Sequence, residues 1–118
     1  MIYIVDDDEF VRRGFALLCR SADLDFMSFE KAEDFISMIK PGENDILVLD
    51  MNMPGMHGCD VLDFLVKNEI FLPVIIITGY DDDANRDCAK KYGAVAYLHK
   101  PVDGQALIDL IRYSVNPV

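Results

Sequence analysis

The chain has 118 residues, the usual size of one domain, and 52% of them are hydrophobic, which is enough for a stable core. Its 21 acidic and 11 basic residues give a net charge of −10, and such a surface repels nucleic-acid phosphates and anionic lipids. No apolar run has the length of a membrane span and the N-terminus lacks a signal-peptide pattern, so we expect a cytoplasmic domain that contacts neither nucleic acid nor membrane itself.

Short apolar segments alternate with amphipathic segments along the chain. Strands are expected at residues 2–5, 26–29, 46–49, 74–77 and 95–98. The first, third and fourth are unbroken runs rich in Val and Ile, which is typical of parallel strands that are buried on both faces. Each segment between or after the strands carries apolar residues at helical spacing. In chain order these stripes are Val11, Phe15, Leu18 and Ala22; Phe35, Ile36 and Ile39; Leu62, Leu65 and Val66; Ala84, Cys88 and Ala89; and Leu107, Leu110 and Ile111.

This alternation predicts an α/β fold. We expect a single doubly wound (βα)5 domain over residues 1–118, with a five-stranded parallel sheet of order 2-1-3-4-5 and helices on both faces. Asp83 and Asp103 are the expected N-caps of the last two helices, and Asp8 is expected to cap or begin the first. In such sheets, ligands bind beyond the carboxyl ends of the strands where the strand order reverses, here between the first and third strands.

Polar side chains follow the central strands at the point where each strand ends. Asp6 and Asp7 follow the first strand, Asp50 the third and Thr78 the fourth, while Lys100 comes after the fifth. Carboxylates that lie together repel each other unless a cation joins them, and Mg²⁺ prefers such oxygen ligands. A lysine and a hydroxyl supply the positive charge and the hydrogen bond that a phosphoryl group needs, and an aspartate can accept that group as an acyl phosphate. The pattern therefore predicts a Mg²⁺-dependent phosphoryl site.

The chain resembles the receiver domains of two-component response regulators over nearly its whole length. The matching segments are IYIVDD (2–7), VLDMNMPG (48–55), IIITG (75–79) and YLHKP (97–101), and their order and spacing together are specific. The resemblance implies a flavodoxin-like fold and a phosphorelay function. In that function the domain takes a phosphoryl group from a phosphohistidine of a sensor histidine kinase or phosphotransfer protein, and it is no enzyme beyond promoting its own phosphotransfer and dephosphorylation.

The resemblance also assigns roles at the phosphoryl site. Asp50 matches the phospho-accepting aspartate. Asp7 matches the direct Mg²⁺ ligand, and Asp6 the carboxylate that acts through a bound water molecule. Asn52 occupies the position whose backbone carbonyl completes the metal ligands.

Four further residues match positions of the family, and Thr78 and Tyr97 among them match its switch. Thr78 matches the hydroxyl that moves to bond a phosphoryl oxygen, and Lys100 the lysine that pairs with the phosphoryl group. Tyr97 matches the aromatic residue that turns inward as the threonine moves, and Pro101 the proline whose preceding peptide bond is commonly cis.

The resemblance implies that this switch reshapes the surface of the fourth helix, fifth strand and fifth helix. Family members contact an output domain, a partner protein or a second copy there. A phosphorylation-dependent homodimer is therefore one expected assembly, with Tyr92 and Tyr113 as candidate contacts.

Other functions remain open from the sequence. An aspartyl-phosphate hydrolase shares the aspartate nucleophile and Mg²⁺, but it usually has a second aspartate where this chain has Asn52, and 118 residues leave no room for its cap domain. A nucleotide-binding module would need a phosphate-binding loop, and the seven glycines form neither G-x-G-x-x-G nor G-x-x-x-x-G-K. A receiver that signals without phosphorylation is disfavoured by the complete residue set. The chain is either a stand-alone receiver or part of a longer regulator.

The sequence predicts no catalytic or metal-binding role for His57 or for the cysteine residues. His57 is expected in a solvated loop. Cys19, Cys59 and Cys88 are an odd number with no C-x-x-C pair, so we expect small, reduced residues in or near the core.

Overall fold

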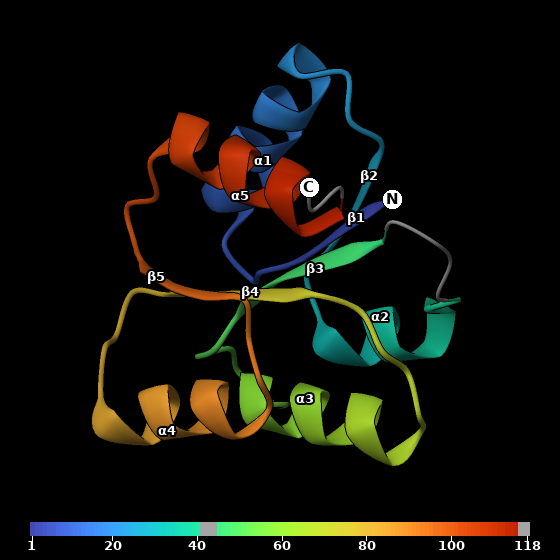
Figure 1. The fold of residues 1–118 in the computed structure, drawn as a ribbon, viewed down its shortest axis with the longest axis vertical. Helices are drawn as coiled ribbons and strands as arrows, with labels where there is room; N and C mark the ends of the chain where they lie inside the picture. Colours follow the sequence, from blue (N-terminus) through green and yellow to red (C-terminus); the bar gives the residue numbers. More distant parts are fainter. Residues whose placement is uncertain (41–44, 116–118) are drawn as a thin grey trace.

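The computed structural model describes residues 1–40 and 45–115, and within them five strands alternate with five helices (Figure 1). The strands are β1 (Ile2–Val5), β2 (Phe26–Phe29), β3 (Ile46–Asp50), β4 (Val74–Thr78) and β5 (Ala96–His99). The helices are α1 (Glu9–Ser21), α2 (Ala32–Met38), α3 (Gly58–Lys67), α4 (Asp83–Lys91) and α5 (Gly104–Val115).

The strands form one parallel sheet in the order β2-β1-β3-β4-β5. Helices α1 and α5 cover one face, and α2, α3 and α4 cover the other (Figure 1). The predicted doubly wound (βα)5 fold is confirmed. Because β1 and β3 are neighbours and both run in the same direction, the segments that follow them meet at one edge of the sheet.

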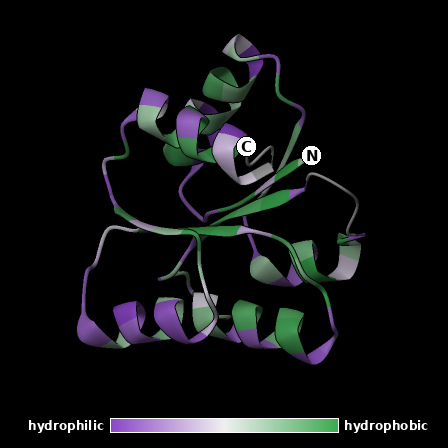
Figure 2. Ribbon diagram, in the orientation of Figure 1, coloured by the Kyte–Doolittle hydropathy of each residue, from purple (hydrophilic) through white to green (hydrophobic). Residues whose placement is uncertain are grey.

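The core consists of two apolar layers, one on each face of the sheet. In β3, Ile46 and Val48 pack in the layer beneath α1 and α5, whereas Leu47 and Leu49 pack in the layer beneath α2, α3 and α4. This alternation explains why the strand is apolar at each position from Ile46 to Leu49 (Figure 2). Each such side chain is fully buried and contributes about 1.5–3 kcal/mol by the area it removes from water.

The strand ends differ from the prediction by one residue at four places. Pairing continues through Asp50 in β3 and Thr78 in β4, and β5 runs over Ala96–His99 instead of residues 95–98. Asp50 and Thr78 therefore belong to the ladder of backbone hydrogen bonds instead of following it. Two residues of the predicted stripes, Ala22 and Ile39, lie just beyond the ends of α1 and α2.

Aspartates begin three of the helices. Asp8 caps α1 by accepting a hydrogen bond from the amide of Phe10 at 2.9 Å, and Asp103 accepts from the amide of Ala106 at 3.1 Å in the first turn of α5. The predicted cap of α4 is wrong by one residue. Asp82 has the extended backbone of an N-cap and accepts from Asn85 at 2.7 Å, whereas Asp83 is already helical.

The expectation that all cysteines are reduced is wrong for one pair. Cys59 of α3 and Cys88 of α4 form a disulfide. The two helices lie side by side on one face of the sheet, and their packing brings the Cα atoms of the pair to 6.1 Å, within the range that a disulfide spans. Cys19 is free and buried.

None of the helices in the described ranges is long and apolar enough to cross a membrane.

Candidate functional site

Three carboxylates meet at the edge of the sheet where β1 and β3 end. Asp6 and Asp7 directly follow β1, and Asp50 is the last residue of β3. Each of them offers an oxygen atom, and these atoms lie within 4.8 Å of one another. Asp6 and Asp50 are buried, whereas Asp7 is exposed to solvent. The sequence prediction that strand ends bring these residues together agrees with the geometry.

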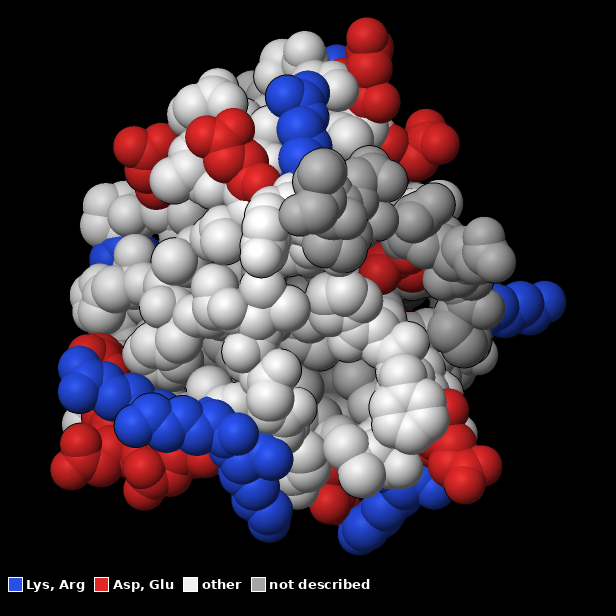
Figure 3. Space-filling model, viewed as in Figure 1, with Lys and Arg blue, Asp and Glu red and all other residues white. Residues whose placement is uncertain are grey.

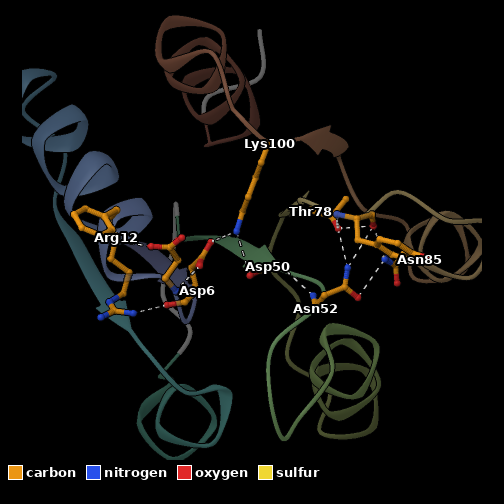
Figure 4. Close-up of polar contacts among 10 residues, drawn as sticks. Asp6, Arg12, Asp50, Asn52, Thr78, Asn85 and Lys100 are labelled. Carbon is orange, nitrogen blue, oxygen red and sulfur yellow. Dashed lines mark hydrogen bonds and ion pairs between the residues drawn. The ribbon is translucent and has the colours of Figure 1, made fainter.

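Lys100 reaches this cluster from the segment after β5 (Figure 4). Its Nζ lies 2.9 Å from Oδ2 of Asp6 and 3.3 Å from Oδ2 of Asp50. Its backbone amide donates to the carbonyl of Thr78 at 2.8 Å, which fixes where the side chain starts, and its peptide bond to Pro101 is cis. Three carboxylates and one ammonium leave a net charge of −2, which a divalent cation would offset.

Backbone hydrogen bonds orient the two buried carboxylates. Oδ1 of Asp6 accepts from the amide of Asp8 at 2.9 Å, and the guanidinium of Arg12 donates to the backbone carbonyl of Asp6 at 2.8 Å. Oδ1 of Asp50 accepts from the amide of Asn52 at 3.2 Å. Each carboxylate is therefore held by the loop that follows its own strand, while its other oxygen faces Lys100.

The site shifts the acidity of its own groups. Burial, followed by the negative charge of Asp6, raises the pKa of Asp50 to about 6, although Lys100 and the amide of Asn52 oppose the increase. Burial by itself would lower the pKa of Lys100, but the hydrogen bond to Asp6 and the charges of both carboxylates outweigh it and raise the pKa of the ammonium above its ordinary value. The lysine therefore remains charged at neutral pH.

The hydroxyl of Thr78 makes three hydrogen bonds on the side of the site away from Lys100 (Figure 4). It donates to the carbonyl of Tyr80 at 2.7 Å, and it accepts from the amide of Tyr80 and from Nδ2 of Asn52, both at 3.0 Å. Its proton and both lone pairs are thus used. In this arrangement the hydroxyl is turned toward α4 and the loop before it.

Two residues that were not predicted as part of the site belong to the same network. Nδ2 of Asn85, in the first turn of α4, donates to the carbonyl of Tyr80 at 3.0 Å and to Oδ1 of Asn52 at 3.4 Å. His57 is the N-cap of α3, with its Nδ1 accepting from Cys59, and its Nε2 lies 3.3 Å from the same Oδ1 of Asn52. The expected solvated-loop histidine is therefore a helix cap that contacts the site.

The predicted aromatic residues lie further out. Tyr97 is half-buried, and its hydroxyl donates to Oδ1 of Asp81 at 3.1 Å. Burial and this hydrogen bond raise the pKa of the Tyr97 phenol. Tyr92 donates to Oδ1 of Asp63 at 3.0 Å, and Tyr113 is 66% exposed on α5.

Known proteins resemble this chain in sequence and in fold. Residues 2–112 match the family model described as response regulator receiver domain. The chain is 35% identical over 111 residues to nodulation protein W of Bradyrhizobium diazoefficiens, covering 94% of this chain and 49% of that protein. It is 34% identical to the transcriptional regulatory protein FixJ of Rhizobium meliloti, covering 94% of this chain and 54% of that protein. The chain thus spans about half the length of these curated relatives.

Solved structures give the same result. The response regulator StyR has a TM-score of 0.89 and 37% identity, with 97% of this chain and 58% of that chain covered. The FixJ-N crystal structure has a TM-score of 0.87 and 32% identity, with 99% of this chain and 94% of that chain covered.

Proposed function

Because the chain belongs to the family of response regulator receiver domains, which are signalling modules, we propose that it accepts a phosphoryl group on Asp50 from a phosphohistidine. The donor is a sensor histidine kinase or a phosphotransfer protein. The observation that supports this most directly is the position of Asp50, whose carboxylate is buried beside Asp6 and contacts Lys100 at 3.3 Å. We further propose that residues 1–118 act as one receiver unit.

The acidic cluster fits Mg²⁺. Asp6, Asp7 and Asp50 are hard oxygen ligands with an excess charge of −2 after Lys100 is counted, and the backbone carbonyl of Asn52 lies on the same loop as Asp50. When bound, Mg²⁺ supplies positive charge to the carboxylates and to the phosphoryl oxygens. These four residues are the proposed ligands, Asp6 through a water molecule.

The chain's own residues account for the transfer. A carboxylate oxygen of Asp50 attacks the phosphorus atom, the phosphorus–nitrogen bond of the phosphohistidine breaks, and its electron pair stays on the imidazole. The ammonium of Lys100 offsets negative charge on a phosphoryl oxygen. The hydroxyl of Thr78 donates a hydrogen bond to another phosphoryl oxygen, and it gives up its hydrogen bond to the carbonyl of Tyr80 to do so.

The response proceeds to the surface formed by α4, β5 and α5. We propose that Tyr97 leaves Asp81 and turns inward when Thr78 moves, so that the phosphoryl group selects one of two arrangements of this surface. Acidic and basic side chains lie next to each other over α4 (Figure 3), which suits recognition by a protein of mixed charge. An output domain, a partner protein or a second copy that contacts Tyr92 and Tyr113 is the proposed partner.

Beryllofluoride, a phosphoryl mimic, tests the proposal without a kinase. Amide resonances of the chain are followed by NMR while beryllofluoride is added with and without Mg²⁺. We expect saturable, Mg²⁺-dependent shifts at Gly79 and Tyr97 in the wild type and none in Asp50→Ala. Asp25→Ala, which removes an exposed carboxylate at the opposite edge of the sheet, is the matched control and behaves as wild type. A wild type that does not respond, or that continuously hydrolyses phosphate esters, contradicts a receiver function.

A further inference from the structure

Asn85 is a buried polar residue in an otherwise apolar helix face. It is 2% exposed, and the other buried residues of α4 are Cys88 and Ala89. Asparagine is a poor residue for a helix and is costly to bury unless its amide is hydrogen-bonded. The groups that its buried amide contacts therefore indicate its role.

Both acceptors of the Asn85 amide are the groups that hold Thr78. Nδ2 of Asn85 donates to the carbonyl of Tyr80, which also accepts the hydroxyl of Thr78. It also donates to Oδ1 of Asn52, whose Nδ2 donates to the hydroxyl of Thr78. Asn85 thus fixes the orientation of the Asn52 amide and the position of the Tyr80 carbonyl at the same time (Figure 4).

We propose that Asn85 is a positioning residue that holds the Thr78 hydroxyl away from the phosphoryl site. Through the hydrogen bonds of Asn85, the first turn of α4 contributes to the free-energy difference between the two arrangements of the domain. The inference rests on the proposed function. The hydroxyl of Thr78 has one proton, so it donates either to the carbonyl of Tyr80 or to a phosphoryl oxygen. Each bond from Asn85 favours the first arrangement, and a phosphoryl group must overcome that preference.

The Asn85→Ala variant tests the proposal through its affinity for beryllofluoride at saturating Mg²⁺. Without the amide, the arrangement seen here loses support, so we expect the apparent Kd for beryllofluoride to fall about fivefold. The Kd for Mg²⁺ alone stays unchanged, because Asn85 contacts none of the three carboxylates and reaches Asn52 at its side-chain Oδ1, not at the backbone carbonyl that is the proposed ligand. Asn68→Ala is the matched control: this amide donates to the carbonyl of Phe64 at 2.8 Å, at the end of α3, and its loss leaves both constants unchanged.

A double-mutant cycle separates positioning of Thr78 from a general effect on α4. In a Thr78→Ala background there is no hydroxyl to hold, so Asn85→Ala no longer changes the affinity for beryllofluoride. Equal effects in both backgrounds, or an unchanged or higher Kd in Asn85→Ala, overturn the proposal. Asn85→Ser is measured in parallel, so that the result does not depend on one substitution. Urea unfolding of each variant verifies that the fold is retained.

The outcomes distinguish this inference from the function on which it rests. If the wild type does not bind beryllofluoride, the receiver function itself fails. If the wild type binds in a Mg²⁺-dependent manner and Asn85→Ala does not change the Kd, the receiver function stands and only the role of Asn85 is refuted.

Discussion

Asp50 carries a carboxylate that is buried beside a second carboxylate, and we predict that its replacement by asparagine stabilises the metal-free fold. The side chain keeps its shape in Asp50→Asn, but the charge next to Asp6 is removed. In the wild type, burial and the charge of Asp6 raise the pKa of Asp50 to about 6, against an ordinary value of 3.8. At neutral pH the folded protein therefore holds an ionised carboxylate in a position that favours the protonated form.

The sign and size of the effect follow from this pKa. Between pH 3.8 and about 6 the folded protein retains a proton on Asp50 that the unfolded chain has released, so the free energy of unfolding falls as the pH rises through this window. Each pKa unit corresponds to about 1.4 kcal/mol, which places the loss at about 3 kcal/mol. This net loss already includes the favourable contact with Lys100, and Asp50→Asn removes it, so we expect a gain of about 1–3 kcal/mol at pH 7.5.

Urea unfolding followed by circular dichroism measures the gain, in EDTA and at pH values from 4 to 8. The variant should be more stable than the wild type at pH 7.5, and the difference should shrink toward pH 4, where the wild-type carboxyl is protonated in the folded state. Mg²⁺ should stabilise the wild type more than the variant, because the variant lacks one ligand. Asp25→Asn, at an exposed position, is the control without a gain. An Asp50→Asn protein that is no more stable than wild type at pH 7.5 would refute the reasoning.

Two further predictions concern the surroundings of this carboxylate. Lys100→Met leaves two buried carboxylates without their ammonium, so it should lower the free energy of unfolding by about 2 kcal/mol at pH 7.5. Mg²⁺ should restore part of this loss. A loss that Mg²⁺ does not reduce would contradict the prediction. Gly58→Ala places a Cβ 2.6 Å from Sδ and 2.9 Å from Cα of Met51. We therefore expect urea unfolding to show about 2 kcal/mol of destabilisation. Because Met51 follows Asp50, we also expect weaker Mg²⁺ binding. Gly14→Ala, with open space around its Cβ, should instead stabilise α1 slightly.

The fold and the acidic half of the site could be predicted because their signals are local. The runs at 2–5, 46–49 and 74–77 are apolar at every position, since helices cover both faces of the sheet. In a parallel sheet, a residue just after a strand lies at a known edge, so Asp6, Asp50 and Lys100 could be brought together without coordinates.

The parts that sequence reasoning missed depend on packing between helices. Cys88 was expected only in the apolar stripe of its helix, and nothing local indicates that α3 and α4 bring it to Cys59. His57 did carry one signal: Asp60 follows three residues later, and the two form a capping box in which histidine replaces the usual serine or threonine. Asn85 has no such pattern, because its partners lie 33 and 5 residues away.

Asn52 joins the acidic cluster to Thr78 and Asn85, and this gives a short hydrogen-bonded route from Asp50 to α4. Its backbone amide donates to Oδ1 of Asp50, while its side chain contacts both Thr78 and Asn85. A change in charge on Asp50 alters an acceptor of Asn52 directly, and a reoriented Asn52 amide alters the hydrogen bonds of Thr78 without displacement of a strand. The strands are fixed by two apolar layers, whereas this network consists of a few hydrogen bonds worth about 1 kcal/mol each. If Asp50 is phosphorylated as proposed, the phosphoryl group therefore acts on a network that costs less to rearrange than the sheet that positions Asp50.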